Sequence, residues 1–129
     1  MERDVFSGRL RLNGEEHGKT LRAANNYAVG LALLNRFEEA KALFRRTIPV
    51  ARRVLGESHE LTLKMRRIYA NALCLDTGAT LDDVREAVTT LEDTRRIARR
   101  VLGGAHPLTK GIENALQYAR AILRAREDA

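Results

Sequence analysis

The feature that most constrains the fold is a passage that the chain repeats. "VARRVLGESHELT" at residues 50–62 returns as "IARRVLGGAHPLT" at residues 97–109, and a weaker copy, "NGEEHGKT", ends at Thr20. The histidine, threonine and glycine of each copy keep their relative places, at an interval of 42 residues and then of 47. A period of this length is typical of stacked helical repeats, in which each unit can bury its apolar face only against a neighbour.

Helical periodicity follows each copy of the passage. Apolar residues recur every three or four positions after Thr20, Thr62 and Thr109, and again over residues 37–55 and 81–102. The sequence therefore predicts an all-α fold, a right-handed α-solenoid of antiparallel helix pairs with about two and a half repeats. We expect a single domain over 1–129, comprising an N-terminal stub at 1–13, repeats at 14–55 and 56–102, and a partial repeat at 103–129.

Local signals indicate where the helices begin and end. Gly56 and Gly103 each follow "RRVL" and predict a helix C-terminus. Thr80 predicts an N-cap, and Pro107 fits the first position of a helix, where no N–H is needed. Pro49 falls inside a predicted helix and predicts a bend there, because proline cannot donate to the preceding turn.

The segment "LRAANNYAVGLALLNRFEEAKALFRR", residues 21–46, resembles a tetratricopeptide repeat. The 42-residue period with "RRVLGxxHxxT" is similar to the long repeats of kinesin light chains, and the resemblance covers residues 9–126. It implies a protein-interaction module with a scaffold or adaptor role, whose first helices line a concave groove that binds an extended peptide. The groove positions that the resemblance implies are Arg22, Asn25, Val29, Lys64, Arg67, Asn71, Gly111, Asn114 and Tyr118, with Cys74 following along the groove.

The chemistry of these positions predicts an acidic partner peptide. None of them is an acid, the basic side chains suit carboxylates, and the amides suit a peptide backbone. Two other functions stay open. The arginine pairs at 45–46, 52–53, 66–67, 95–96 and 99–100 could bind nucleic acid, or could simply form a solvated outer face. A segment that self-assembles through an uncapped C-terminal end is the other alternative, with the apolar residues Ile112, Leu116, Ile122 and Leu123 uncovered.

Nothing in the sequence predicts an enzyme, a cofactor or a membrane span. There is no glycine-rich phosphate loop and no "GxSxG" motif, and the histidines, one in each repeat, are expected to cap helices or pack loops rather than bind metal. The single cysteine, Cys74, is expected to be a small packing residue, and one cysteine suits a reducing compartment, so we expect a cytoplasmic protein. The net charge of +6 lies mostly in residues 1–55, which hold 11 basic and 6 acidic side chains.

Overall fold

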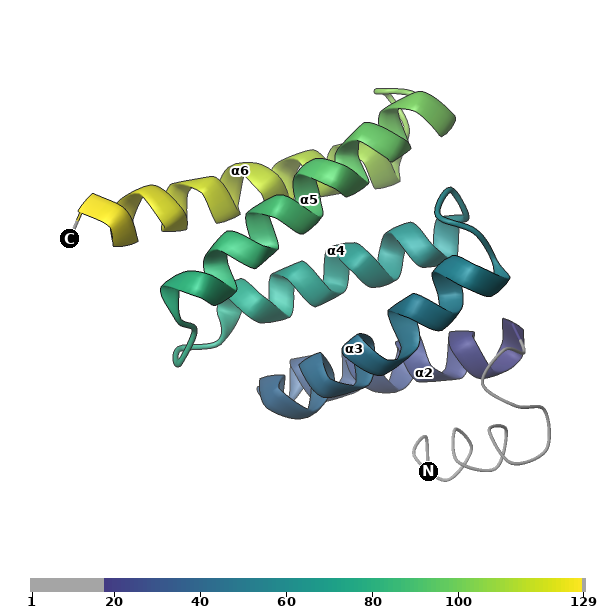
Figure 1. The fold of residues 1–129 in the computed structure, drawn as a ribbon, viewed down its shortest axis with the longest axis horizontal. Helices are drawn as coiled ribbons and strands as arrows, with labels where there is room; N and C mark the ends of the chain where they lie inside the picture. The colour runs from purple at the N-terminus through teal and green to yellow at the C-terminus, as the bar shows by residue number, and fades with distance from the viewer. Residues whose placement is uncertain (1–17, 129) are drawn as a thin grey trace. The chain divides into compact units, whose positions relative to one another are not determined.

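The computed structural model describes residues 18–128, which form five α-helices and no strand. The helices are α2 (Gly18–Leu33), α3 (Phe37–Val54), α4 (Glu60–Leu75), α5 (Leu81–Val101) and α6 (Pro107–Asp128) (Figure 1). The predicted fold class, an all-α helical-repeat solenoid, is confirmed. The stub predicted at 1–13 and His17 lie outside the described residues.

The chain comprises two compact units, residues 1–65 and residues 66–129. In the first unit α2 and α3 pack against each other as an antiparallel pair, and in the second unit α5 and α6 do the same (Figure 1). Residues 60–65 of α4 belong to the first unit, and residues 66–75 belong to the second. The predicted extent of the domain over 1–129 stays a prediction.

Each unit has its own apolar core. In the first, Ala28 of α2 and Ala40 of α3 are fully buried, as expected of small residues where two helices approach closely, and Phe44 is the largest fully buried side chain. In the second, Leu91 of α5 and Ile112 of α6 are almost completely buried. Burying one large apolar side chain contributes about 1.5–3 kcal/mol, so such residues dominate the stability of both units.

The helix ends follow the predicted signals. At the start of α5 the Thr80 hydroxyl accepts from the Asp83 N–H at 3.1 Å, and the Thr80 N–H donates to the Asp83 carboxylate at 3.1 Å. Gly56 and Gly103 take φ angles of 98° and 88° just beyond α3 and α5, a conformation that residues with a Cβ atom rarely adopt. The predicted N-cap, the two glycine stops and the start of α6 at Pro107 are all confirmed.

Pro49 lies inside α3, which is helical at every residue from Phe37 to Val54. Its ring is exposed, so no core packing depends on it. The bend expected at this position stays a prediction.

Replacing Pro49 with alanine is expected to stabilise the protein, because alanine supplies a helical N–H and removes the ring that crowds the preceding turn. We expect a gain of about 1–3 kcal/mol, measured as a higher urea concentration at half-unfolding. Arg96 occupies the matching place in α5, 47 residues later, so Arg96→Pro should lower that concentration. A lower midpoint for Pro49→Ala would contradict this account of α3.

Candidate functional site

One close approach and one electrostatic interaction relate α4 to α6 in the second unit. The Arg67 guanidinium of α4 reaches Gly111 of α6, where a Cβ atom would stand only 2.4 Å from Arg67 Nη1. Farther along both helices, Arg126 acts electrostatically on the thiol of Cys74. Because Arg67 precedes Cys74 and Gly111 precedes Arg126, α4 and α6 run in the same direction. That arrangement is the one expected of equivalent helices in successive repeats.

Arg67 has an unsatisfied hydrogen-bond donor. Its side chain is half-buried, and its buried Nε has no hydrogen-bond partner among residues 18–128. Leaving a buried donor unpaired costs about 1–3 kcal/mol, which an incoming acceptor would recover. Since the guanidinium carries five donors in a planar fork, a carboxylate or a peptide carbonyl suits it best. Gly111, without a side chain, leaves the room that the guanidinium needs.

The other predicted groove residues of the second unit lie on the same two helices. Asn71 is half-buried and follows Arg67 by one turn of α4. On α6, Gly111, Asn114 and Tyr118 are three and then four residues apart, so they share one side of the helix. Asn114 is exposed, and Tyr118 is 54% exposed, which is unusual for an aromatic side chain.

The predicted groove residues of the first unit differ in their access to solvent. Arg22 and Lys64 are exposed, and Val29 is half-buried. Asn25 is only 8% exposed, and its Oδ1 is buried with no hydrogen-bond partner among the described residues. The peptide contact predicted at Asn25 stays a prediction; its neighbour in the chain, Ala24, is fully buried.

The described histidines cap helices. His59 Nδ1 accepts from the N–H of Leu61 at the start of α4, and His106 Nδ1 accepts from the N–H of Leu108 at the start of α6, both at 3.1 Å. Each bond satisfies one of the N–H groups that a helix N-terminus leaves without an intrahelical partner. The predicted capping role is therefore confirmed for both. Within residues 18–128, no three His, Cys, Asp or Glu side chains come together as a metal site would require.

Cys74 is half-buried on α4. Burial raises the pKa of its thiol above the ordinary value, and the nearby positive charge of Arg126 offsets only part of that rise. The neutral thiol is therefore favoured at neutral pH, and a thiol is a weaker nucleophile than a thiolate.

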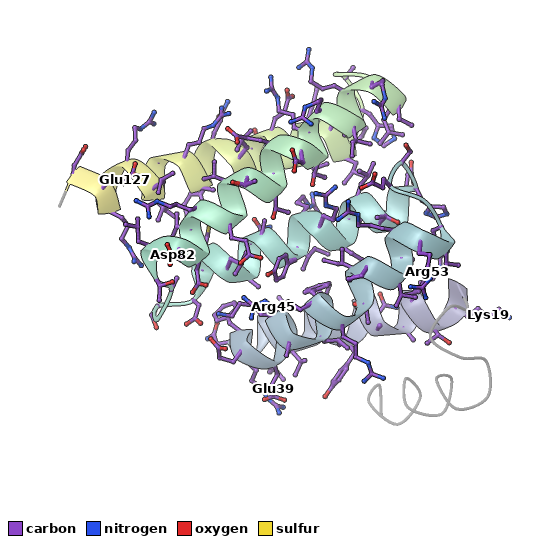
Figure 2. All side chains as sticks on the ribbon, in the orientation of Figure 1. Lys19, Glu39, Arg45, Arg53, Asp82 and Glu127 are labelled. Atoms are coloured by element: carbon purple, nitrogen blue, oxygen red, sulfur yellow. The ribbon has the colours of Figure 1, made fainter. Side chains whose placement is uncertain are left out.

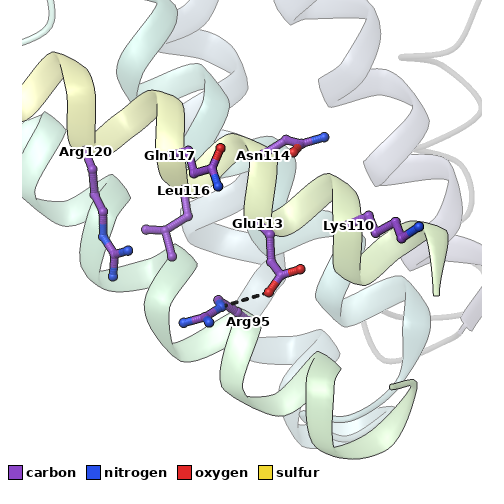
Figure 3. A pocket seen from close by; sticks show the side chains of 7 residues that line it. All are labelled: Arg95, Lys110, Glu113, Asn114, Leu116, Gln117 and Arg120. Carbon is purple, nitrogen blue, oxygen red and sulfur yellow. Dashed lines mark hydrogen bonds and ion pairs between the residues drawn. The ribbon is translucent and has the colours of Figure 1, made fainter. Parts of the chain in front are cut away.

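A charged cleft between α5 and α6 is the surface that sequence reasoning missed (Figure 3). It consists of two adjoining hollows of about 310 and 460 Å³, both lined by Arg95 and Arg120. Glu113 points into it and accepts from Arg95 Nε at 3.1 Å and from Arg99 Nη1 at 2.8 Å. The hydrogen bond from Arg99 does most to lower the pKa of the Glu113 carboxyl below its ordinary value, and the hydrogen bond from Arg95 adds to this effect. Arg120 in turn pairs with Glu92 at 2.9 Å. We call this surface the α5/α6 cleft; its other lining residues include Arg96, Lys110 and Gln117.

A signal for the cleft was present in the repeat. The third copy is offset from the first by 89 residues (42 + 47), which places four residues of α6 on the equivalents of a buried apolar row of α2. In α2 that row is almost fully buried; in α6 its members are exposed, apart from the half-buried Glu113. The four replacements, read from α2 to α6, are Leu21 to Lys110, Ala24 to Glu113, Ala28 to Gln117 and Leu31 to Arg120.

Two expectations about the surface were wrong in part. Ile112 and Leu116 are buried, and Ile122 and Leu123 are half-buried, so α6 does not present the bare apolar face that we expected. Arg66 is only 7% exposed, so the pair at 66–67 is not part of a solvated outer face. The long aliphatic stem of an arginine can pack in a protein interior, which residue type alone does not reveal.

No helix among the described residues has the length and apolarity needed to cross a membrane.

Comparison with known proteins identifies one repeat. Residues 20–61, which cover most of α2, all of α3 and the first two residues of α4, match the sequence profile of the tetratricopeptide repeat. No curated protein sequence matches the chain significantly. The chain thus contains a repeat of the tetratricopeptide type, and repeats of this type generally mediate protein–protein interaction.

Removing the histidine cap of α6 tests the structural role of His106. His106→Ala should lower the free energy of unfolding by about 1 kcal/mol, because the Leu108 N–H loses its acceptor. His106→Asn should retain most of the stability, since asparagine is a strong N-cap residue. The measurement is urea unfolding followed by circular dichroism, and equal midpoints for wild type and His106→Ala would contradict the capping role.

The Glu113 pairs predict a pH dependence of stability. Because the pKa of Glu113 is lower in the folded state, its contribution is present above the ordinary glutamate pKa and is lost as pH falls through the folded value. The urea midpoints of wild type and Glu113→Gln should therefore differ at pH 7 and converge at an acidic pH well below the ordinary glutamate pKa. A difference that is the same at both pH values would show that the ion pairs do not contribute.

Proposed function

We propose that this chain is a protein-interaction module that binds an extended acidic peptide along its first helices, in a scaffold or adaptor role. The observation that carries the proposal is Arg67, whose buried Nε lacks a partner and whose guanidinium lies against the bare backbone of Gly111. A carboxylate or backbone carbonyl of a peptide would supply the missing acceptor.

The remaining contacts follow from side-chain chemistry. Lys64 precedes Arg67 by one helical turn and would hold a second carboxylate, and Arg22 would do so from α2. Asn71 and Asn114 would pair with the peptide backbone, because an amide both donates and accepts. Two apolar contacts would come from Val29 and the exposed ring of Tyr118. The affinity should be around micromolar, since a short array buries less than a standard interface of about 1,600 Å².

The proposed function includes a type of repeat and a cellular compartment. The 42-residue interval with the motif RRVLGxxHxxT favours the long repeats of kinesin light chains, and the single cysteine favours a reducing, cytoplasmic setting. No catalytic step is part of the proposed function. Nucleic-acid binding through the outer arginines and self-assembly through the half-buried Ile122 and Leu123 are the competing functions, and both make different predictions in the test below.

Charge reversal on α4 tests the peptide surface. The probe is a library of fluorescein-labelled, acidic 12-residue peptides, with binding followed by anisotropy. Lys64→Glu combined with Arg67→Glu should weaken binding about tenfold or more, and Arg67→Gln should weaken it less. Raising the salt concentration should also weaken binding to the wild type, because exposed charges are screened over about 8 Å at physiological ionic strength.

The matched control is Arg45→Glu combined with Arg46→Glu, the same charge change on exposed positions of α3. It should leave peptide binding within about twofold, and the helical circular dichroism signal of both double variants should match that of wild type. Normal binding by the α4 variant, or duplex DNA competing as well as peptide, would contradict the proposed function. Light scattering that shows oligomers at the concentrations used would favour self-assembly instead.

A further inference from the structure

We propose that the α5/α6 cleft is a second docking surface, which binds an acidic helix of a partner protein. It lies on the side of α6 where Lys110 and Arg120 project, away from Gly111 and its contact with α4. Asn114 lines one of the hollows and also belongs to the proposed peptide surface, but the basic side chains of the cleft take no part in that surface.

The shape of the surface suits a helix. Lys110, Glu113, Gln117 and Arg120 stand at intervals of three, four and three residues, the spacing of a continuous row along one side of α6. The equivalent row of α2 is buried in a unit where α2 packs against a helix, α3. In the second unit the row is exposed, apart from the half-buried Glu113, and borders two hollows along α5, which leaves it accessible to a helix of another protein.

The charge of the surface suits acids. Five basic side chains line the cleft, together with the acids Glu92 and Glu113. A third acid, Asp93, pairs with Arg96 at 3.0 Å. When Asp93 is counted with the cleft, the net charge is two positive charges. Glu113 shows what the cleft holds, because one carboxylate accepts from two guanidinium groups there. A carboxylate of the partner helix would compete with Glu113 for Arg95 and Arg99. The basic residues of the cleft are Arg95, Arg96, Arg99, Lys110 and Arg120.

Neither the cleft nor the α2/α3 pair of a second copy of this chain suits the cleft. Two copies joined cleft to cleft would bring the same surplus of positive charge face to face. Residues 18–55 hold eight basic and two acidic side chains, so α2 and α3 of another copy would also present like charge. Like charges repel across an interface, so the complementary occupant of the cleft presents acids.

The experiment uses a fluorescein-labelled 21-residue peptide, built of alanine with glutamates along one helical face, and a twin with a central proline that breaks the helix. Binding of the full chain is followed by anisotropy at low salt. Lys110→Glu combined with Arg120→Glu should weaken binding of the helical peptide about tenfold. Glu113→Gln should strengthen it about threefold or more, because the internal carboxylate that competes for Arg95 and Arg99 is gone.

The matched control is Glu127→Gln, which removes another α6 carboxylate that pairs with an α5 arginine, Arg85, but lies outside the cleft. If Glu113 acted only on stability, Glu113→Gln would not raise the affinity for the peptide. A gain in affinity in Glu113→Gln and a loss in Lys110→Glu/Arg120→Glu therefore indicate docking in the cleft and not an effect on folding. The proposal would be overturned if wild type did not bind the helical peptide, or if it bound the proline twin with the same affinity. It would also be overturned if Glu113→Gln and Glu127→Gln changed the affinity equally, or if a 20-base-pair DNA duplex bound more tightly than the peptide.

Discussion

The junction that stops one helix and starts the next is the constraint on which the structure depends. At the end of α5, Gly103 takes a positive φ and donates its N–H to the carbonyls of Ala98 and Arg99. Three residues later His106 caps α6, and the Thr109 hydroxyl lies 3.5 Å from the carbonyl of Ala98. Gly56, His59 and Thr62 make the equivalent junction between α3 and α4, with the same distances for the cap and for the threonine contact. Because the hydrogen bonds of this turn join near neighbours in the chain, a short sequence motif is enough to specify the turn, and the motif can recur. The turn fixes where the next helix begins.

The junction also decides which charges meet. Once α6 runs back along α5, Glu113 lies between Arg95 and Arg99, and Arg120 lies beside Glu92. Asp82, at the start of α5, and Glu127, near the end of α6, lie at the same end of this helix pair, where both pair with Arg85 (Figure 2). Exposed ion pairs of this kind are screened by solvent and contribute little to stability.

One helix, α6, therefore has sides of three different chemistries. Ile112, Leu116 and Ala119 form its buried apolar side. Gly111, on another side, leaves room for the Arg67 guanidinium of α4. The third side carries the charged row that begins at Lys110 and borders the α5/α6 cleft. Because side chains three or four positions apart share a face, a single helix can keep these chemistries separate and contribute to both proposed surfaces.

By itself, the sequence determined the helices and their ends. The periodicity of apolar residues predicted all five, and Gly56, Gly103, Thr80 and Pro107 set boundaries within one or two residues, because caps and turns rest on contacts between near neighbours. The capping role of the histidines and the candidate at Arg67 also followed from the repeat and from the resemblance that it carries. These features depend on a residue and on its position in a repeating unit.

Only the tertiary structure decided which polar groups are reachable and which charges are paired. Asn25 and Asn114 hold equivalent positions in their repeats, yet Asn25 is buried and Asn114 is exposed, because burial depends on what packs over the position. Arg66 looked like a surface residue and is inside the fold. The α5/α6 cleft brings Glu92 together with Arg120, which lies 28 positions away in the chain. Such pairs are fixed by how two helices pack and by the rotamers that their long side chains adopt, and neither is encoded in a window of neighbouring residues.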